Sequence, residues 1–281
     1  MKISVQTDNL KMLNEALNSD CDKIRFGSEF CEFKIPTLAI LKKAYVLVKK
    51  EGKDFAYITP RVSTTSIENI RKQLSFLDKK GEINIIFNDL GTLSILEQYS
   101  NLKPHLGRQL VYVPARCPWL EIGPKSFLAK RRLAKIFYQT SLNYKPSVRF
   151  FQNYGVKDVD VDWIPNCFKH YYFLVRNGLV LSVYLHLIPV TITRKCHTAR
   201  FLKEENLWTC SRPCYKRAFL LKEKFMHVEF YLQGNTVFSY IKPSQSDVNK
   251  LHKIGASELV IMMNPITKIE SKEDINELIG S

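Results

Sequence analysis

The sequence predicts an α/β fold in which one TIM-barrel-like (β/α) domain spans residues 1–281 and carries a cysteine-rich loop at the C-terminal rim of its strands. Three observations support this prediction. Short apolar runs of strand type alternate with longer segments whose apolar residues recur at helical spacing. No low-complexity tract or linker interrupts the alternation. A chain of 281 residues, 45% hydrophobic and 25% charged, can enclose one large core.

The first half of the chain repeats a strand followed by a helix four times. The first strand is predicted over 3–6, and a helix follows because Leu10 and Leu13 recur at helical spacing. Pro36 favours the start of the second helix and Gly52 its end. The remaining elements of this half are strands over 23–27, 55–59 and 83–87, and helices over 66–77 and 90–99.

The second half is less regular but keeps the same rhythm. Residues 114–155 are rich in proline and aromatic side chains and show a weaker pattern. The predicted strands here are 109–113, 156–161, 179–187, 226–232, 237–241 and 258–262, and the predicted helices are 165–175, 248–254 and 270–278. Strands and helices alternating at these lengths predict a mostly parallel sheet, closed or nearly closed into a barrel.

The composition is typical of a cytoplasmic protein. The N-terminus lacks the apolar core of a signal peptide, and no run reaches the ~20 apolar residues that span a bilayer. Seven cysteines are therefore expected to be free thiols or metal ligands. The formal charge of +15 favours a solvated basic surface, with RNA, an anionic membrane or an acidic partner as alternatives. The densest basic run predicts an amphipathic helix that contains Lys125, Lys130, Arg131, Arg132 and Lys135.

Residues 196–214 carry the clearest chemical signal. Cys196, Cys210 and Cys214 fall within nineteen residues of a polar segment. Thiolates select zinc or iron–sulfur clusters, and either normally needs a fourth ligand. Loops that leave the C-terminal ends of barrel strands share one face, and Cys31 follows the second predicted strand. Cys196 follows the strand predicted to end at Leu187, so both point to the same rim. We therefore expect Cys31 to complete a four-cysteine site, which leaves zinc and iron–sulfur open.

Cations flank this segment and can offset the charge of bound thiolates. They are Arg194, Lys195, Arg200 and Arg212. His197 is expected beside the ligands rather than among them. The alternative for the whole pattern is coincidence, because buried cysteines also serve as small hydrophobic residues. Cys21, Cys117 and Cys167 are interpreted in that way, although cations beside Cys117 could lower its pKa.

The stretch from His186 to Cys214 resembles peptidase family U32, the collagenase-like peptidases. The specific matches are the segment 193–200 and the Cys210/Cys214 pair. Most members carry a further cysteine seven residues before the one matched by Cys196, where this chain has Pro189. That absence, together with Cys31 after the segment 27–30, is similar to the UbiV-type branch of oxygen-independent ubiquinone biosynthesis. The resemblance implies a four-iron four-sulfur (4Fe-4S) cluster held by Cys31, Cys196, Cys210 and Cys214.

The resemblance also implies a function and partners. Members of this branch pair with a second U32-family protein that holds its own cluster, and the heterodimer hydroxylates a quinone precursor without O2. A lipid-carrier protein would be a further partner. Other branches hydroxylate bases in tRNA or ribosomal RNA, so an RNA-modifying factor is the alternative, and a zinc-binding scaffold is a third. Ser182 and Leu187 replace a glutamate and a glycine that are usual in the family, which suits a partner subunit better than a self-sufficient enzyme.

Four residues are candidates for substrate binding. His186 lies in an apolar strand before the cysteines, where a core histidine is the alternative. Arg108 stands where the family often has polar groups facing the barrel mouth, and Asn88 and Asp89 are similar candidates. Protease motifs of the His-Glu-x-x-His or Gly-x-Ser-x-Gly type are absent, so we expect no peptidase chemistry.

Overall fold

Eight parallel strands close into a barrel in this computed structural model, which describes residues 1–117, 127–204, 206–222, 224, 228–267 and 277. Around the barrel the strand order is β1-β12-β7-β6-β5-β4-β3-β2. Every neighbouring pair runs parallel, and β1 and β12 close the ring. The strands are β1 (Lys2–Thr7), β2 (Lys23–Phe26), β3 (Asp54–Ile58), β4 (Ile83–Phe87), β5 (Leu102–Leu106), β6 (Asp158–Asp162), β7 (Val180–Tyr184) and β12 (Ala256–Met262). The predicted fold class is thereby confirmed.

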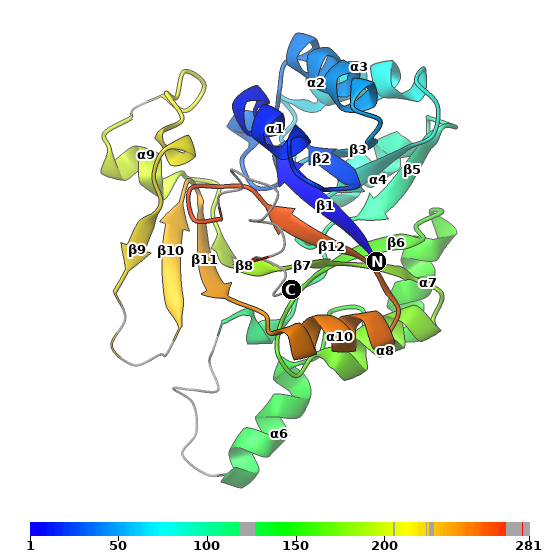
Figure 1. Cartoon of the computed structure of the whole chain (residues 1–281), viewed down its shortest axis with the longest axis vertical. Coiled ribbons are helices and arrows are strands. Elements are labelled where there is room, and N and C mark those ends of the chain that lie inside the picture. The colour runs from blue at the N-terminus through cyan, green and yellow to red at the C-terminus, as the bar shows by residue number, and fades with distance from the viewer. Residues whose placement is uncertain (118–126, 205, 223, 225–227, 268–276, 278–281) are drawn as a thin grey trace.

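A second, antiparallel sheet stands beside the barrel (Figure 1). Its order is β8-β11-β10-β9, and β8 follows β7 after a single residue. The strands are β8 (His186–Ile192), β9 (Phe219–Leu221), β10 (Glu229–Gln233) and β11 (Thr236–Ile241). We call it the small sheet. The segment that carries three of the candidate cysteines lies between β8 and β9 and therefore belongs to it.

Most of the helices cover the outside of the barrel, and one, at residues 197–201, lies against the small sheet instead (Figure 1). They are α1 (Leu10–Leu17), α2 (Leu38–Lys50), α3 (Ile67–Asp78), α4 (Leu90–Leu96), α6 (Phe127–Phe137), α7 (Lys145–Asn153), α8 (Phe168–Arg176), α9 (His197–Phe201) and α10 (Gln245–Lys253). Polar side chains begin several of them: Asn9 and Asp89 each accept a backbone N–H of the first turn, and Ser244 forms a capping box with Asp247. No helix among the described residues is long and apolar enough to cross a membrane.

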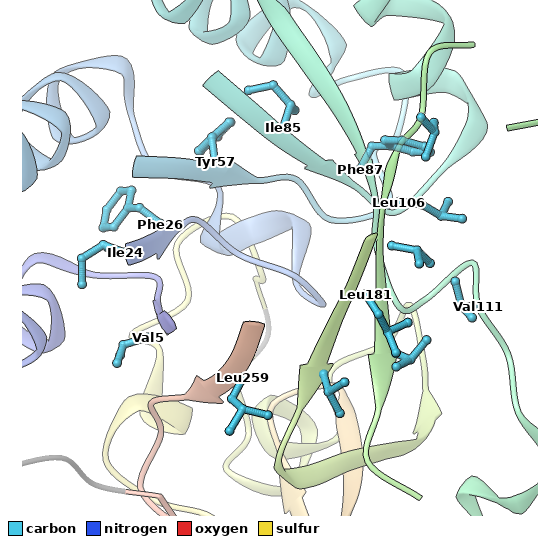
Figure 2. Close-up of a cluster of buried hydrophobic side chains, with 14 of the residues drawn as sticks. Val5, Ile24, Phe26, Tyr57, Ile85, Phe87, Leu106, Val111, Leu181 and Leu259 are labelled. Carbon is cyan, nitrogen blue, oxygen red and sulfur yellow. The ribbon is translucent and has the colours of Figure 1, made fainter. Parts of the chain in front are cut away.

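Side chains alternate between the two faces of each barrel strand, as the period of two requires. Outward residues such as Val5, Phe26, Tyr57 and Leu259 pack with the helices into one large buried cluster (Figure 2). Inward residues are partly apolar on β3 and β4, where Ala56, Ile58 and Ile86 form a small cluster of their own. Most of the other inward side chains are polar or charged.

Ion pairs fill that interior in two layers. In the first, Arg25 lies 2.7 Å from both Asp160 and Glu258. Lys23 also lies 2.6 Å from Glu258, and His105 lies 2.7 Å from Asp160.

In the second layer, Arg108 binds Glu29 at 2.8 Å and Asp162 at 2.7 Å, and Arg116 binds Asp162 at 2.6 Å. Side chains of both layers are almost fully buried. Buried ion pairs therefore fill much of the interior of this barrel.

Two strand predictions are wrong. The fifth strand is Leu102–Leu106, not 109–113. Residues 107–111 turn instead, with backbone bonds from Leu110 to Gly107 and from Val111 to Arg108. Val111 is buried although it lies outside any strand, which is why its segment resembles one in sequence.

The predicted strand 179–187 is two strands. His186 adopts a φ of +68°, which ends β7 and sends the chain into β8, where His186 pairs with Ile241 of the small sheet. The other predicted strands and helices match observed ones within a few residues. The strand predicted over 226–232 is observed at Glu229–Gln233. The helix predicted over 270–278 lies, apart from residue 277, outside the described residues. The basic helix is observed as α6, whereas Lys125 lies outside the described residues.

Candidate functional site

One cavity is lined by all four candidate ligand cysteines. It lies between the barrel rim and the small sheet and has a volume of about 60 Å³, room for several water-sized groups. Cys31 comes from the loop after β2, whereas Cys196, Cys210 and Cys214 come from the segment between β8 and β9. Segments from the first tenth and the final third of the chain thus share this cavity, whereas their binding of a common metal stays a prediction.

The Cys31 loop is shaped by its first residues. Gly27 follows β2 with a φ of +131°, a conformation that side chains disfavour. Ser28 then folds the loop over, because its hydroxyl donates to the Cys31 carbonyl at 2.7 Å and accepts the Cys31 N–H at 3.3 Å. Cys31 next begins a short 3-10 turn, Glu32–Lys34. These local bonds fix the thiol at the cavity wall.

The other three thiols are positioned by turns. The Cys196 sulfur begins α9 and accepts the Ala199 N–H at 3.4 Å. The Cys210 sulfur accepts the N–H of Arg212 at 3.3 Å, and Arg212 itself adopts a φ of +55°. The carbonyl of Cys214 accepts a hydrogen bond from the Gln233 side chain at 2.9 Å. N–H donors to sulfur of this kind help set the reduction potential of a bound iron–sulfur cluster.

Asn235 joins the two halves of the site. Its amide nitrogen donates to the Phe30 carbonyl at 2.9 Å and to the Thr193 carbonyl at 2.8 Å. Phe30 directly precedes Cys31, and Thr193 lies three residues before Cys196. Asn235 is buried in the tight turn between β10 and β11. A single side chain therefore bridges the N-terminal and C-terminal thiol segments.

Lys34 is a buried cation beside the thiols. Its ammonium lies 3.0 Å from Asp8 and 4.2 Å from the centre of the Tyr215 ring. Burial raises the pKa of Cys31 to about 11, while Lys34 acts in the opposite direction. Burial also raises the pKa of Cys214, and there too Lys34 opposes it. Although burial lowers the pKa of Lys34, Asp8 and the thiols raise it overall, so this lysine stays charged.

Sequence reasoning missed Lys34, although it lies three residues after Cys31 in the same loop. Of the four cations that it did single out, Arg212 lines this cavity and Arg194 lines an adjoining one. Lys195 and Arg200 are exposed and line neither. The expected charge compensation therefore comes largely from a different residue.

The four thiols, as the structure places them, are not arranged as a site for a single metal ion. Among the described residues, no three His, Cys, Asp or Glu side chains are close enough together to hold one metal ion. A tetrahedral zinc site with ~2.3 Å bonds would hold its thiolates only about 3.8 Å apart. In a four-iron cluster each thiolate binds a different iron, so the cluster accepts a wider set. The four thiols line one cavity, and a cluster held by them stays a prediction.

A second cavity adjoins the first and has a volume of about 490 Å³. Cys31 and Cys196 line both cavities, together with Phe30, Phe33 and Asn235. Two arginines, Arg61 and Arg194, line the second cavity alone. The thiol site and a pocket of small-molecule size are therefore neighbours.

The predicted substrate-binding residues take different places. Arg108 is fully buried, pairs with Glu29 and Asp162, and donates to the Leu187 carbonyl at 2.8 Å. Its guanidinium also lies 3.8 Å from the centre of the Tyr184 ring. Every donor direction is thus engaged within the protein, and a substrate role for Arg108 stays a prediction.

The other three are also held by the fold. Asn88 is buried and donates to the Thr59 carbonyl at 2.8 Å. Asp89 caps α4. His186 is buried at the turn between the two sheets and stacks on Tyr240, 5.6 Å between ring centres. None of the four lines either cavity, so their binding roles also stay predictions.

The remaining cysteines lie elsewhere. Cys21 and Cys167 are buried, and burial raises the pKa of both. Burial raises the pKa of Cys117 as well, and no cation lowers it, contrary to what its basic neighbour in sequence suggested. None of the three lines the thiol cavity. Cys117 is thus a suitable control for experiments on the site.

Comparison with known proteins gives distant likenesses. No protein-family model and no curated protein matches the sequence. Among solved structures, a U32 peptidase is similar at a TM-score of 0.49 and 11% identity, over 94% of this chain and 93% of that one. A FabK mutant from Thermotoga maritima scores 0.44 at 9% identity, over 97% and 67%, and dihydropteroate synthase from Thermus thermophilus scores 0.41 at 12%, over 99% and 92%. With TM-scores below 0.5, none of these likenesses assigns the chain to a family.

Proposed function

We propose that this protein holds a 4Fe-4S cluster on Cys31, Cys196, Cys210 and Cys214 and acts in oxygen-independent hydroxylation of a quinone precursor. In this proposal it is the UbiV-type member of peptidase family U32 and works as one subunit of a heterodimer with a second family member. The observation that carries the proposal is the single cavity lined by four thiols from segments about 165 residues apart in sequence (196 − 31). The absence of protease motifs and the engaged polar side chains of the barrel support a subunit role over a peptidase.

The residues of the site have separate tasks in this proposal. The cluster, when bound, would supply electron transfer or assist oxygen transfer at the cavity wall. Lys34 offsets the negative charge of the thiolates, and the N–H groups of Ala199 and Arg212 stabilise the sulfurs. Asn235 keeps the two thiol segments together. The adjoining cavity gives a substrate a place against Cys31 and Cys196.

The test is metal analysis after anaerobic purification. We expect a brown protein with about four irons per chain, and loss of both colour and iron when any one of the four cysteines is changed to serine. Cys117→Ser is the matched control and should keep its iron, because Cys117 lies outside the cavity. A colourless protein with one zinc per chain would reject the cluster and favour a zinc-binding scaffold.

RNA-base hydroxylation at the same site is the second candidate, favoured by the formal charge of +15. It predicts binding to tRNA or ribosomal RNA fragments that weakens steeply as salt rises. Indifference to RNA at low salt would remove this candidate. Quinone-precursor hydroxylation is tested separately, by assaying the chain with the second family member under anaerobic conditions.

A further inference from the structure

The cavity that adjoins the thiol site has the size and the lining of a ligand pocket. Its volume of about 490 Å³ falls in the range of small-molecule sites, roughly 300–1,000 Å³. Cys31 and Cys196 form part of its wall, so a molecule in it would lie against two of the four thiols. The pocket is also built from both sheets, because Arg61 follows β3 of the barrel and Arg194 follows β8 of the small sheet.

Two guanidinium groups in this pocket are available to a ligand. Within the described part of the chain, neither Arg61 nor Arg194 forms an ion pair or a side-chain hydrogen bond. The one carboxylate on the wall, Glu32, is already engaged: Ser63 donates to it through its N–H at 2.9 Å and through its hydroxyl.

Apart from the candidate cluster ligands, the charged side chains of the lining therefore favour an anion. Two arginines face one carboxylate whose oxygen is bonded within the protein. Guanidinium groups recognise oxyanions through paired N–H donors, and such charge-assisted hydrogen bonds are the strong ones. A neutral ligand would gain nothing from either guanidinium charge.

Aromatic and aliphatic side chains form another part of the wall, beside the polar residues Ser63, Thr64, Gln109, Thr193 and Asn235. Phe30 and Phe33 line it, with Val62 and Ile192. Both phenylalanines are already fixed by edge contacts, Phe30 on Phe238 at 5.4 Å and Phe33 on Trp208 at 4.8 Å between ring centres. Flat apolar walls that need no rearrangement suit an aromatic ring.

We propose that this pocket binds a small aromatic acid, with its oxyanion on Arg61 and Arg194 and its ring against Phe30, Phe33 and the thiol site. The inference rests on the proposed function, because it names the class of substrate that would reach the cluster. It requires no change of the fold. A phosphate ester of an aromatic alcohol shares the same recognition chemistry, and the experiment separates the two.

The test is isothermal titration calorimetry of the full chain, purified anaerobically, with benzoate, phenyl phosphate and benzyl alcohol as probes. We expect benzoate to bind and benzyl alcohol to give no measurable heat at the same concentration. Arg61→Gln and Arg194→Gln should each weaken benzoate binding by at least about tenfold. Arg149→Gln, an exposed arginine of α7, is the matched control and should change nothing.

The outcomes are distinct. If phenyl phosphate binds more tightly with the same dependence on both arginines, the pocket is an oxyanion site for phosphate esters, and the shared chemistry stands. Equal binding of benzoate and benzyl alcohol, no binding of either acid, or unchanged affinity in both arginine variants overturns the inference. Loss of iron rather than affinity in those variants would also overturn it, because the arginines would then serve the thiols.

Iron content measured on the same samples separates this inference from the proposed function. Protein without iron that still binds benzoate through both arginines would reject the cluster and keep the pocket. Protein with about four irons that binds neither acid would keep the cluster and reject the pocket. Thermal melting of each variant confirms that the fold is intact, which is expected because both arginines are exposed.

Discussion

Gly27→Ala should be among the most damaging small substitutions in this chain. An added Cβ at Gly27 would lie 2.2 Å from the carbonyl oxygen of Ile58, a backbone atom of the neighbouring strand. The backbone cannot simply move away, because the Gly27 N–H donates to the Thr7 carbonyl at 3.0 Å. The residue is thus held between two strands of the barrel. Its φ of +131° is a second obstacle, since side chains rarely adopt it.

The magnitude follows from these two terms. A residue other than glycine in a disfavoured backbone region costs about 1–3 kcal/mol, and overpacking of a rigid site costs a further ~1–3 kcal/mol. We expect Gly27→Ala to lower the free energy of unfolding by about 2–6 kcal/mol. Gly52→Ala is the matched control: its φ is +69°, but nothing lies within 4 Å of the added Cβ. Only the backbone term applies there, roughly 1 kcal/mol after the gain from a less flexible unfolded chain.

Urea unfolding under reducing, anaerobic conditions measures both variants, followed by far-ultraviolet circular dichroism. Gly27→Ala should also lose iron, because Cys31 lies four residues further along the displaced loop. Gly52→Ala should keep it. Equal midpoints and slopes for the two variants would refute the reasoning, since they would mean that the barrel absorbs the clash at Ile58 without cost.

Four further predictions follow from the site and the barrel interior. Asn235→Ala removes the two bonds that join the thiol segments and should cost about 1–3 kcal/mol in urea unfolding with partial loss of iron, whereas iron retained at the wild-type level would contradict its bridging role. Glu258→Gln leaves Arg25 and its neighbouring lysine under-compensated inside the barrel and should cost about 3–5 kcal/mol by the same assay; a loss under ~1 kcal/mol would contradict it. Although burial opposes it, Arg25 lowers the pKa of Asp160 and of Glu258 below their usual values of 3.8 and 4.5. The stability that these carboxylates contribute is therefore fully present above about pH 4.5 and lost as the pH falls through the folded-state values, so the urea midpoint should fall between pH 5 and pH 3, and no fall would contradict the ion-pair assignment. Lys34→Met removes the buried cation beside the thiols and should shift the reduction potential of the iron-loaded protein to more negative values in a redox titration, with an unchanged potential contradicting its role.

Most of the barrel could be predicted from the sequence because its elements follow simple periodicities. The strands that were found early have apolar outward faces and end at glycine or turn residues, as Lys23–Phe26 does before Gly27. The strand Leu102–Leu106 is not predicted because Lys103 and Pro104 interrupt its apolar pattern. The apolar run that ends at Val113 matches a strand pattern more closely, although it forms no strand. Burial without a strand is the physical cause of that error.

The small sheet was the harder part. Its first strand continues from the last residues of a barrel strand with one residue between them, so the apolar run from 179 onward shows no break in sequence. The break depends on a φ of +68° at His186, a residue that gives little warning of it. The charged barrel interior is visible in the sequence: Asp158, Asp160 and Asp162 alternate with valines along one strand, which indicates carboxylates on one face of it.

One premise of the four-cysteine hypothesis is wrong. It placed Cys196 on a loop after a barrel strand, whereas Cys196 follows β8 of the small sheet. The four thiols still line one cavity, because β8 begins at the barrel rim and Asn235, between β10 and β11, donates a hydrogen bond to the Phe30 carbonyl. Spacing in sequence could identify the ligand types, but the approach of two sheets and the nearby Lys34 depend on tertiary contacts that no local pattern encodes.

The ion pairs of the barrel explain why the candidate site lies beside the barrel rather than at its centre. Many barrel enzymes build their sites from polar side chains at the mouth. Here the Arg108 side chain fills the mouth of the barrel and donates hydrogen bonds to Glu29, Asp162 and the Leu187 carbonyl. Glu29 also lies two residues before Cys31, so the same pairing that seals the barrel anchors the thiol loop at its rim. Chemistry at the barrel centre would break a buried ion pair, whereas chemistry between rim and small sheet leaves the pairs intact. The small sheet is therefore half of the candidate site. The segment between its strands β8 and β9 supplies three of the four thiols, and its residue Asn235 links them to the loop of the fourth.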